Sequence, residues 1–199
     1  MKSNVKCNRY FFGLGTVGRD MLYTMVSMYL IFYLTDILNL PDSTMWWMTG
    51  AFAVLRIFDA VNDPFMGLLV DNTHSRFGKF KPWIAIGGVI GGILTILLFT
   101  DFGLTGAGYV ISFVVIYLIW DLTYGANDIA YWSMLPSLTL DQKEREKTGS
   151  FARICANIGM YIIVIGIVPI TKALGDNKRA WFILAVAVVI ITLMFLCFT

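Results

Sequence analysis

Residues 180–198 read AWFILAVAVVIITLMFLCF, a run without a single charged side chain. A helix that crosses a bilayer needs about 20 mainly apolar residues, so this run predicts a membrane-spanning helix. The rest of the chain has the same character, because 58% of its 199 residues are apolar and only 14% are charged. Soluble domains carry about 25% charged residues. Lipid is therefore the expected solvent for the outer surface.

Working outward from that run, the sequence predicts an all-α, polytopic membrane protein in which residues 1–199 form one domain of six membrane-spanning helices. Turn residues and charges separate the apolar runs, and the segment 141–147 is predicted to be a solvated loop. The six helices are expected at approximately 11–37, 44–71, 82–100, 106–136, 149–172 and 180–198.

The basic residues indicate how such a bundle is oriented. Most lysines and arginines outside the apolar runs lie at the N-terminus and in the segments 71–81 and 141–147, whereas the opposite side holds only Lys172, Lys178 and Arg179. By the positive-inside rule both termini are expected to be cytoplasmic, in a multi-pass protein of the cell (inner) membrane. The net charge of +2 gives no indication of nucleic-acid binding.

Ionisable residues inside the predicted spans carry the most information, because each costs about 2.5–3.5 kcal/mol at a helix centre. Asp59 and Asp63 are four residues apart and share one helical face, with Arg56 three residues before Asp59. Asn62 adds a neutral amide oxygen. This oxygen-only set suits Na⁺, Li⁺ or a proton rather than a soft transition metal. Since adjacent carboxylates repel, coupled binding of an ion or proton is expected here.

A second polar stripe lies in the predicted helix 106–136. Asp121, Tyr124, Asp128 and Trp132 follow one another at spacings of three, four and four residues, which places them on one helical face. A carboxylate accepts hydrogen bonds from sugar hydroxyls, and an indole one turn away covers the C–H side of the ring. The stripe therefore predicts a sugar site, and Arg153 is placed to reach the same cavity.

Each of these residues also has a structural interpretation that the pattern alone leaves open. We do not expect all seven charges inside the predicted spans to be structural at once, because each is costly to bury; they are Arg19, Asp20, Arg56, Asp59, Asp63, Asp121 and Asp128. The alternatives are an Arg56–Asp59 ion pair that only fixes helix packing, Asp63 as a helix end before Pro64, Asp121 as a packing partner of Arg19, and Trp132 in an aromatic belt at the membrane interface.

The motifs of common enzyme classes are missing from the sequence. It contains no HExxH, Walker A or GxSxG pattern, which removes the commonest routes to hydrolytic and nucleotide chemistry. An intramembrane aspartyl protease would need an aspartate in a GxGD setting, and none is present. We therefore expect a protein that is not an enzyme and that uses no cofactor.

Several ordered stretches resemble a known transporter family. Gly67-Leu-Leu-Val-Asp71, followed by Arg76-Phe-Gly-Lys-Phe-Lys-Pro-Trp83, is similar to the helix 2–3 loop signature of the major facilitator superfamily. Its ending, Gly78-Lys-Phe-Lys-Pro-Trp83, resembles the form found in the glycoside–pentoside–hexuronide:cation symporters. The other similar stretches are Gly18–Asp20, Arg56–Gly67, Tyr124–Pro136 and Asp141–Glu146, so that the resemblance runs over essentially the whole chain.

The resemblance implies a cation-coupled sugar symporter that works by alternating access, with Na⁺ or H⁺ as the coupling ion. It assigns the cation ligands to Asp59, Asn62 and Asp63. The residues it assigns to the sugar side are Asp20, Asp128, Trp132 and Arg153, with Arg19 and Tyr124 nearby. Those it assigns to a cytoplasmic gate are Asp71, Arg76 and Lys79.

The sequence departs from the family pattern at two residues and in its length. Gly125 stands where the family carries a threonine hydroxyl, which leaves the choice between Na⁺ and H⁺ open, and Asp121 adds a carboxylate without an assigned role. Family members have two six-helix halves, and this chain resembles the N-terminal one. The expected partners are a sugar or glycoside, the bilayer, and a C-terminal half or a second copy. The alternative is a truncated or non-transporting membrane subunit or sugar sensor.

Overall fold

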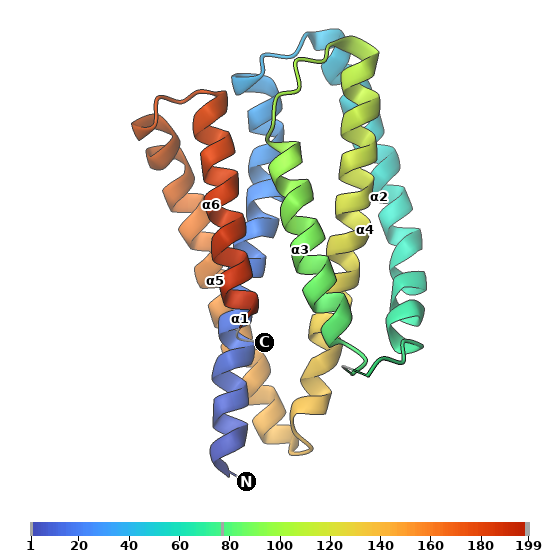
Figure 1. Cartoon of the computed structure of the whole chain (residues 1–199), viewed down its shortest axis with the longest axis vertical. Coiled ribbons are helices and arrows are strands. Elements are labelled where there is room, and N and C mark those ends of the chain that lie inside the picture. Colours follow the sequence, from blue (N-terminus) through green and yellow to red (C-terminus); the bar gives the residue numbers. More distant parts are fainter. Residues whose placement is uncertain (1, 77, 198–199) are drawn as a thin grey trace.

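The computed structural model describes residues 2–76 and 78–197, and within them the chain is helical without any strand (Figure 1). This confirms the all-α prediction for the described residues. A π-helical turn, η1 (Tyr33–Ile37), continues the first helix. The α-helices are α1 (Lys2–Phe32), α2 (Asp42–Asp71), α3 (Lys81–Leu98), α4 (Gly106–Leu138), α5 (Gln142–Ala173) and α6 (Lys178–Leu196).

Among the described residues, α3, α4, α5 and α6 are long and apolar enough to cross a membrane. The more polar α1 and α2 fall outside this group. They carry five of the seven charged residues that the sequence placed inside spans, namely Arg19 and Asp20 on α1 and Arg56, Asp59 and Asp63 on α2. The structure thus describes a multi-pass membrane protein in which α1 and α2 also carry charged residues into the bundle.

Two predicted boundaries differ from the structure. The first helix begins at Lys2 rather than near residue 11. The prediction of a loop at residues 141–147 is wrong, because α5 already begins at Gln142. Asp141 caps this helix by accepting a hydrogen bond from the Lys143 backbone N–H, so the charged residues form its first turns. The predicted end of the last helix, residue 198, lies outside the described residues.

α1 is the central helix, packed between α5 and α6, while α3 contacts α4 and α6, and α2 packs against α4 (Figure 1). A close approach holds α1 to α5: a methyl group added at Gly159 would overlap the carbonyl oxygen of Val17. Small residues permit such approaches, and they drive helix association in lipid, where no hydrophobic force acts between helices. Gly159 therefore sets the distance between α1 and α5.

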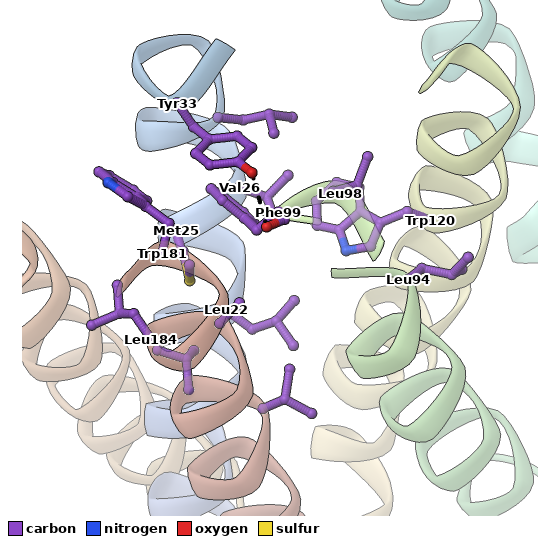
Figure 2. Packing of buried hydrophobic residues seen from close by; sticks show 14 of the residues in the cluster. Leu22, Met25, Val26, Tyr33, Leu94, Leu98, Phe99, Trp120, Trp181 and Leu184 are labelled. Atoms are coloured by element: carbon purple, nitrogen blue, oxygen red, sulfur yellow. Dashed lines mark hydrogen bonds between the residues drawn. The ribbon is translucent and has the colours of Figure 1, made fainter. Parts of the chain in front are cut away.

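A cluster of aromatic side chains fills the bundle where α1 ends and α6 begins (Figure 2). The rings of Phe99 and Trp181 lie parallel with centroids 6.0 Å apart, and the Tyr33 hydroxyl donates to the Phe99 carbonyl oxygen at 3.0 Å. All three side chains are fully buried. The stacked rings and the hydrogen-bonded hydroxyl make this part of the core apolar and closely packed. The polar residues of the bundle lie elsewhere.

Candidate functional site: a charged cavity among four helices

The polar residues of the spans gather around one cavity of about 400 Å³. Four helices contribute to its wall, so residues far apart in sequence meet there. We call it the charged cavity. Its lining residues are Asp20 and Tyr23 from α1; Arg56, Asp59 and Asp63 from α2; Asp121, Tyr124, Gly125, Asp128, Ile129 and Trp132 from α4; and Arg153, Ala156 and Asn157 from α5.

α2 presents its charged face to the charged cavity. Asp59 and Asp63 both line it, as their spacing predicted. Pro64 lies inside α2, which continues to Asp71, so the interpretation of Asp63 as a helix end is wrong. Arg56 approaches Asp59 at 4.0 Å between nitrogen and oxygen, a distance that makes a weak ion pair.

The structure does not bring Asn62 to the cavity wall. Successive residues of a helix are turned by about 100° around its axis, so the neighbour of a lining residue in sequence need not share its face. Asn62 adjoins Asp63 along the chain without lining the same space. Its assignment as a cation ligand stays a prediction that this arrangement does not support.

Asp121 lines the charged cavity from α4, together with Asp59 and Asp63 of α2. Gly125, one turn further along α4, leaves space beside Asp63: a methyl group at Gly125 would lie 3.9 Å from the Asp63 Oδ1 atom. The interpretation of Asp121 as the packing partner of Arg19 is wrong, because Arg19 bonds another residue. Asp121 instead belongs to the group of carboxylates contributed by α2 and α4.

Arg19 lies behind the cavity wall and donates to Asp128. The arginine side chain is 3% exposed, whereas that of Asp128 is 43% exposed. The guanidinium also lies over the Tyr131 ring, with its carbon 4.2 Å from the ring centroid. The carboxylate and the aromatic face stabilise this buried cation, while its Nε and Nη1 atoms are buried without a hydrogen-bond partner among the described residues. Arg19 therefore positions Asp128 and is not itself part of the lining.

Trp132 and Arg153 approach one another across the interface of α4 and α5. The Arg153 guanidinium carbon lies 4.7 Å from the centroid of the Trp132 ring, within the range of a cation–π contact. Both side chains line the charged cavity. Trp132 therefore faces the interior of the bundle, and its interpretation as an interfacial-belt residue is wrong.

Comparison with known proteins identifies the chain. Residues 11–199 match the family described as MFS/sugar transport protein. The chain belongs to this family. It is 36% identical to a lactose permease of Lactobacillus delbrueckii subsp. bulgaricus, over 94% of this chain and 32% of the permease. A raffinose carrier protein of Pediococcus pentosaceus is also 36% identical, over 94% of this chain and 32% of the carrier.

An inner membrane symporter of Escherichia coli is 31% identical to this MFS chain, over 94% of the chain and 40% of the symporter. The MFS chain thus spans about a third of the length of the permease and the carrier. These relatives are named as transporters, not as enzymes, in agreement with the expectation from the missing enzyme motifs.

The residues assigned to a gate lie apart from the lining of the charged cavity, at the end of α2 and in the loop that follows it. Lys79 Nζ lies 2.8 Å from the Asp71 carboxylate, so two of the three residues form an ion pair across this loop. Arg76 lies in the same loop and is exposed. The structure brings Asp71 and Lys79 together, and the role of all three residues in gating stays a prediction.

Two polar lining residues of the MFS chain were missed by sequence reasoning. Tyr23 lies three residues after Asp20, and Asn157 lies four residues after Arg153, so each shares a helical face with a residue that was predicted. This spacing is the signal that would have found them. Among residues 2–76 and 78–197, no three Asp, Glu, His or Cys side chains lie close enough together to hold a metal ion.

Proposed function

We propose that the chain forms the N-terminal half of a cation-coupled sugar symporter. The observation that carries the proposal is that the charged cavity places the facing carboxylates of α2 and α4 in the same space as Asp128, Trp132 and Arg153. Sites for a cation and for a hydroxyl-rich solute that share one cavity are able to influence each other. The names of the lactose permease, the raffinose carrier and the symporter support this reading.

The sugar side of the cavity offers both kinds of hydrogen-bonding group. Asp20 and Asp128 supply acceptors for hydroxyls, and the Arg153 guanidinium supplies donors. The contact between Arg153 and Trp132 orients both side chains, and the indole offers apolar surface to the C–H groups of a sugar ring. Arg19 holds Asp128 from behind, so that this acceptor is in position before the solute arrives.

The cation side is formed by Asp59 and Asp63 of α2 together with Asp121 of α4. Two carboxylates in contact within a bundle repel one another unless a proton or a cation lies between them. Asp59, Asp63 and Asp121 line the same cavity, and Gly125 brings no side-chain oxygen to this wall. We therefore propose Na⁺ or H⁺ as the coupling ion, with H⁺ favoured by the gathered carboxylates and by the glycine at position 125.

The remaining features of the proposal concern the whole protein. All six α-helices would span the cell membrane with both termini cytoplasmic, as the distribution of basic residues indicates. A C-terminal half of the longer protein, or a second copy, would supply the opposite wall of the cavity. The Asp71–Lys79 ion pair would open and close during alternating access between the two sides.

Uptake of radiolabelled sugars by the full-length protein in proteoliposomes tests the proposal. Galactosides, pentosides and glucuronides are offered under an imposed Na⁺ gradient, an imposed H⁺ gradient, or neither. We expect gradient-driven accumulation of one class, and its loss in Trp132→Ala. Trp47→Ala is the matched control, because Trp47 is 75% exposed and does not line the cavity. Binding of sugar without accumulation would overturn the proposal in favour of a sensor.

A further inference from the structure

A second large cavity lies on the outer surface of the bundle, between the beginning of α3 and the end of α6. Its volume is about 460 Å³, and we call it the α3–α6 groove. The two helices run side by side there (Figure 1). Apart from one lysine and one cysteine its lining is aliphatic, formed by Lys81, Ile84, Ala85, Val89, Leu193, Leu196 and Cys197.

Glycines on α3 bring the two helices close together beside the groove. A methyl group at Gly88 would overlap the Leu196 side chain, and one at Gly92 would lie 2.7 Å from a methyl carbon of Val189. On the adjoining face Ala85 and Val89 project outward and are exposed. α3 is in tight contact with α6 on its glycine face, and the side chains on the adjoining face are exposed. This arrangement leaves the α3–α6 groove open along α3.

The helix lengths place the α3–α6 groove within the hydrocarbon layer of the bilayer. α3 has 18 residues, and a helix of that length extends about 27 Å, close to the roughly 30 Å of a bilayer core. α3 and α6 are both apolar enough to cross a membrane. An aliphatic furrow on two such helices faces acyl chains, and Lys81, the first residue of α3, lies at the boundary with the headgroups.

Lys81 carries a charge that the described residues do not neutralise. The neighbouring Lys79 is paired with Asp71 at 2.8 Å, but within residues 2–76 and 78–197 no carboxylate forms an ion pair with Lys81. A lysine at a helix end with an apolar stem and a charged tip favours a phosphate at the interface. The loop before it is rich in basic residues, as expected of the side that faces anionic lipid.

We propose that the α3–α6 groove binds an anionic phospholipid, with one acyl chain along Ala85 and Val89 and the phosphate beside Lys81. The aliphatic lining of the groove complements the acyl chain, and the unpaired charge of Lys81 at its end complements the phosphate. The proposal goes beyond transport, since none of these residues lines the charged cavity. It identifies a surface by which the composition of the bilayer acts on the bundle.

Photolabelling of the full-length protein tests the proposal. Phosphatidylglycerol carrying a diazirine in one acyl chain is incorporated into phosphatidylethanolamine vesicles, and a diazirine phosphatidylethanolamine serves as the matched probe. We expect the anionic probe to label residues 81–89 and 193–197 about fivefold more strongly than the zwitterionic probe, the preference that one lysine near an anionic headgroup confers.

Three variants separate the two parts of the ligand. Lys81→Gln should abolish the preference for the anionic probe, whereas Lys172→Gln, at the last turn of α5, should leave it unchanged. Ala85→Phe should reduce labelling by both probes, because the new ring fills the groove. Equal labelling by the two lipids would overturn the headgroup assignment. Absence of label from these segments would show that protein covers the groove and would overturn the proposal as a whole.

Discussion

Arg19, almost fully buried in α1, donates to Asp128 of α4, whose carboxylate is 43% exposed toward the charged cavity. One partner is thus a buried cation, and the other is a carboxylate that lines the cavity and that we propose as a sugar ligand. Burying an arginine in a bundle is costly unless a carboxylate compensates it. The pair therefore ties the position of a proposed sugar ligand to the packing of α1 against the rest of the bundle.

Removal of the Asp128 charge should lower stability as well as sugar binding. Asp128→Asn leaves Arg19 buried without a counter-charge, and we expect a loss of roughly 2 kcal/mol, less than for a fully buried pair because Asp128 is partly open. Asp20→Asn is the control, since Asp20 lines the same cavity but forms no ion pair with the described residues. Thermal unfolding of the full-length protein measures both. Equal loss in the two variants would contradict the role of Arg19.

The packing of α1 on α5 should be sensitive to one methyl group. Gly159→Ala places a carbon against the Val17 carbonyl oxygen, and such overpacking typically costs about 1–3 kcal/mol. Gly166→Ala, on the same helix, meets only the Ile170 side chain at 3.6 Å and should be neutral or slightly stabilising. Denaturation in detergent compares the two. A stable Gly159→Ala variant would show that α1 and α5 are free to separate.

The apolar runs predicted the cores of the helices because hydrophobic length is a local property of the sequence. The start of α5 was missed because its first turns carry charged residues, and only the cap at Asp141 marks the helix. The partner of Arg19 was not predictable, since Asp121 and Asp128 lie on one face of α4 and the choice depends on how α1 packs. Asn62 does not line the cavity beside Asp63, because neighbours along a helix point in different directions, and its assignment as a cation ligand, which the family resemblance implied, stays a prediction.

The nature of the coupling ion should change when an oxygen is added at position 125. Gly125→Thr fits beside Asp63, because a carbon there lies at an ordinary contact distance of 3.9 Å. Its hydroxyl supplies one more neutral ligand, worth about 1 kcal/mol, or several-fold in Na⁺ affinity. Gly125→Val has the same shape without the oxygen. Na⁺-stimulated uptake that rises in the threonine variant alone is the expected result, and equal behaviour of both variants would argue against a cation site here.

The loop between α3 and α4 is tied to α6 by an ion pair that depends on pH. Lys178 donates to Asp101 at 2.6 Å, and this bond, with that from the Gly103 N–H, lowers the pKa of Asp101 below its ordinary value. A lowered pKa stabilises the fold above the unfolded pKa of about 4. That contribution is lost as the pH falls through the folded pKa.

Asp101→Asn should therefore lower the free energy of unfolding at pH 7 by less than about 1 kcal/mol, as for other exposed pairs. The difference from the unsubstituted protein should shrink as the pH falls below about 4 and disappear at a pH below the folded pKa, where the aspartate is protonated in both states. Thermal unfolding at both pH values measures it, and Asp176→Asn, in the turn before α6, is the control. A difference that persists at low pH would assign the effect to something other than charge.

Accumulation of labelled sugar against its gradient, compared in Asp59→Asn and the unsubstituted full-length protein, tests the central claim most directly. Asp42→Asn, in the first turn of α2, is the matched control. If Asp59 binds the coupling ion, the variant loses ion-driven accumulation while exchange of sugar across the membrane continues, and the control retains both. Accumulation at the level of the unsubstituted protein in Asp59→Asn would contradict the account.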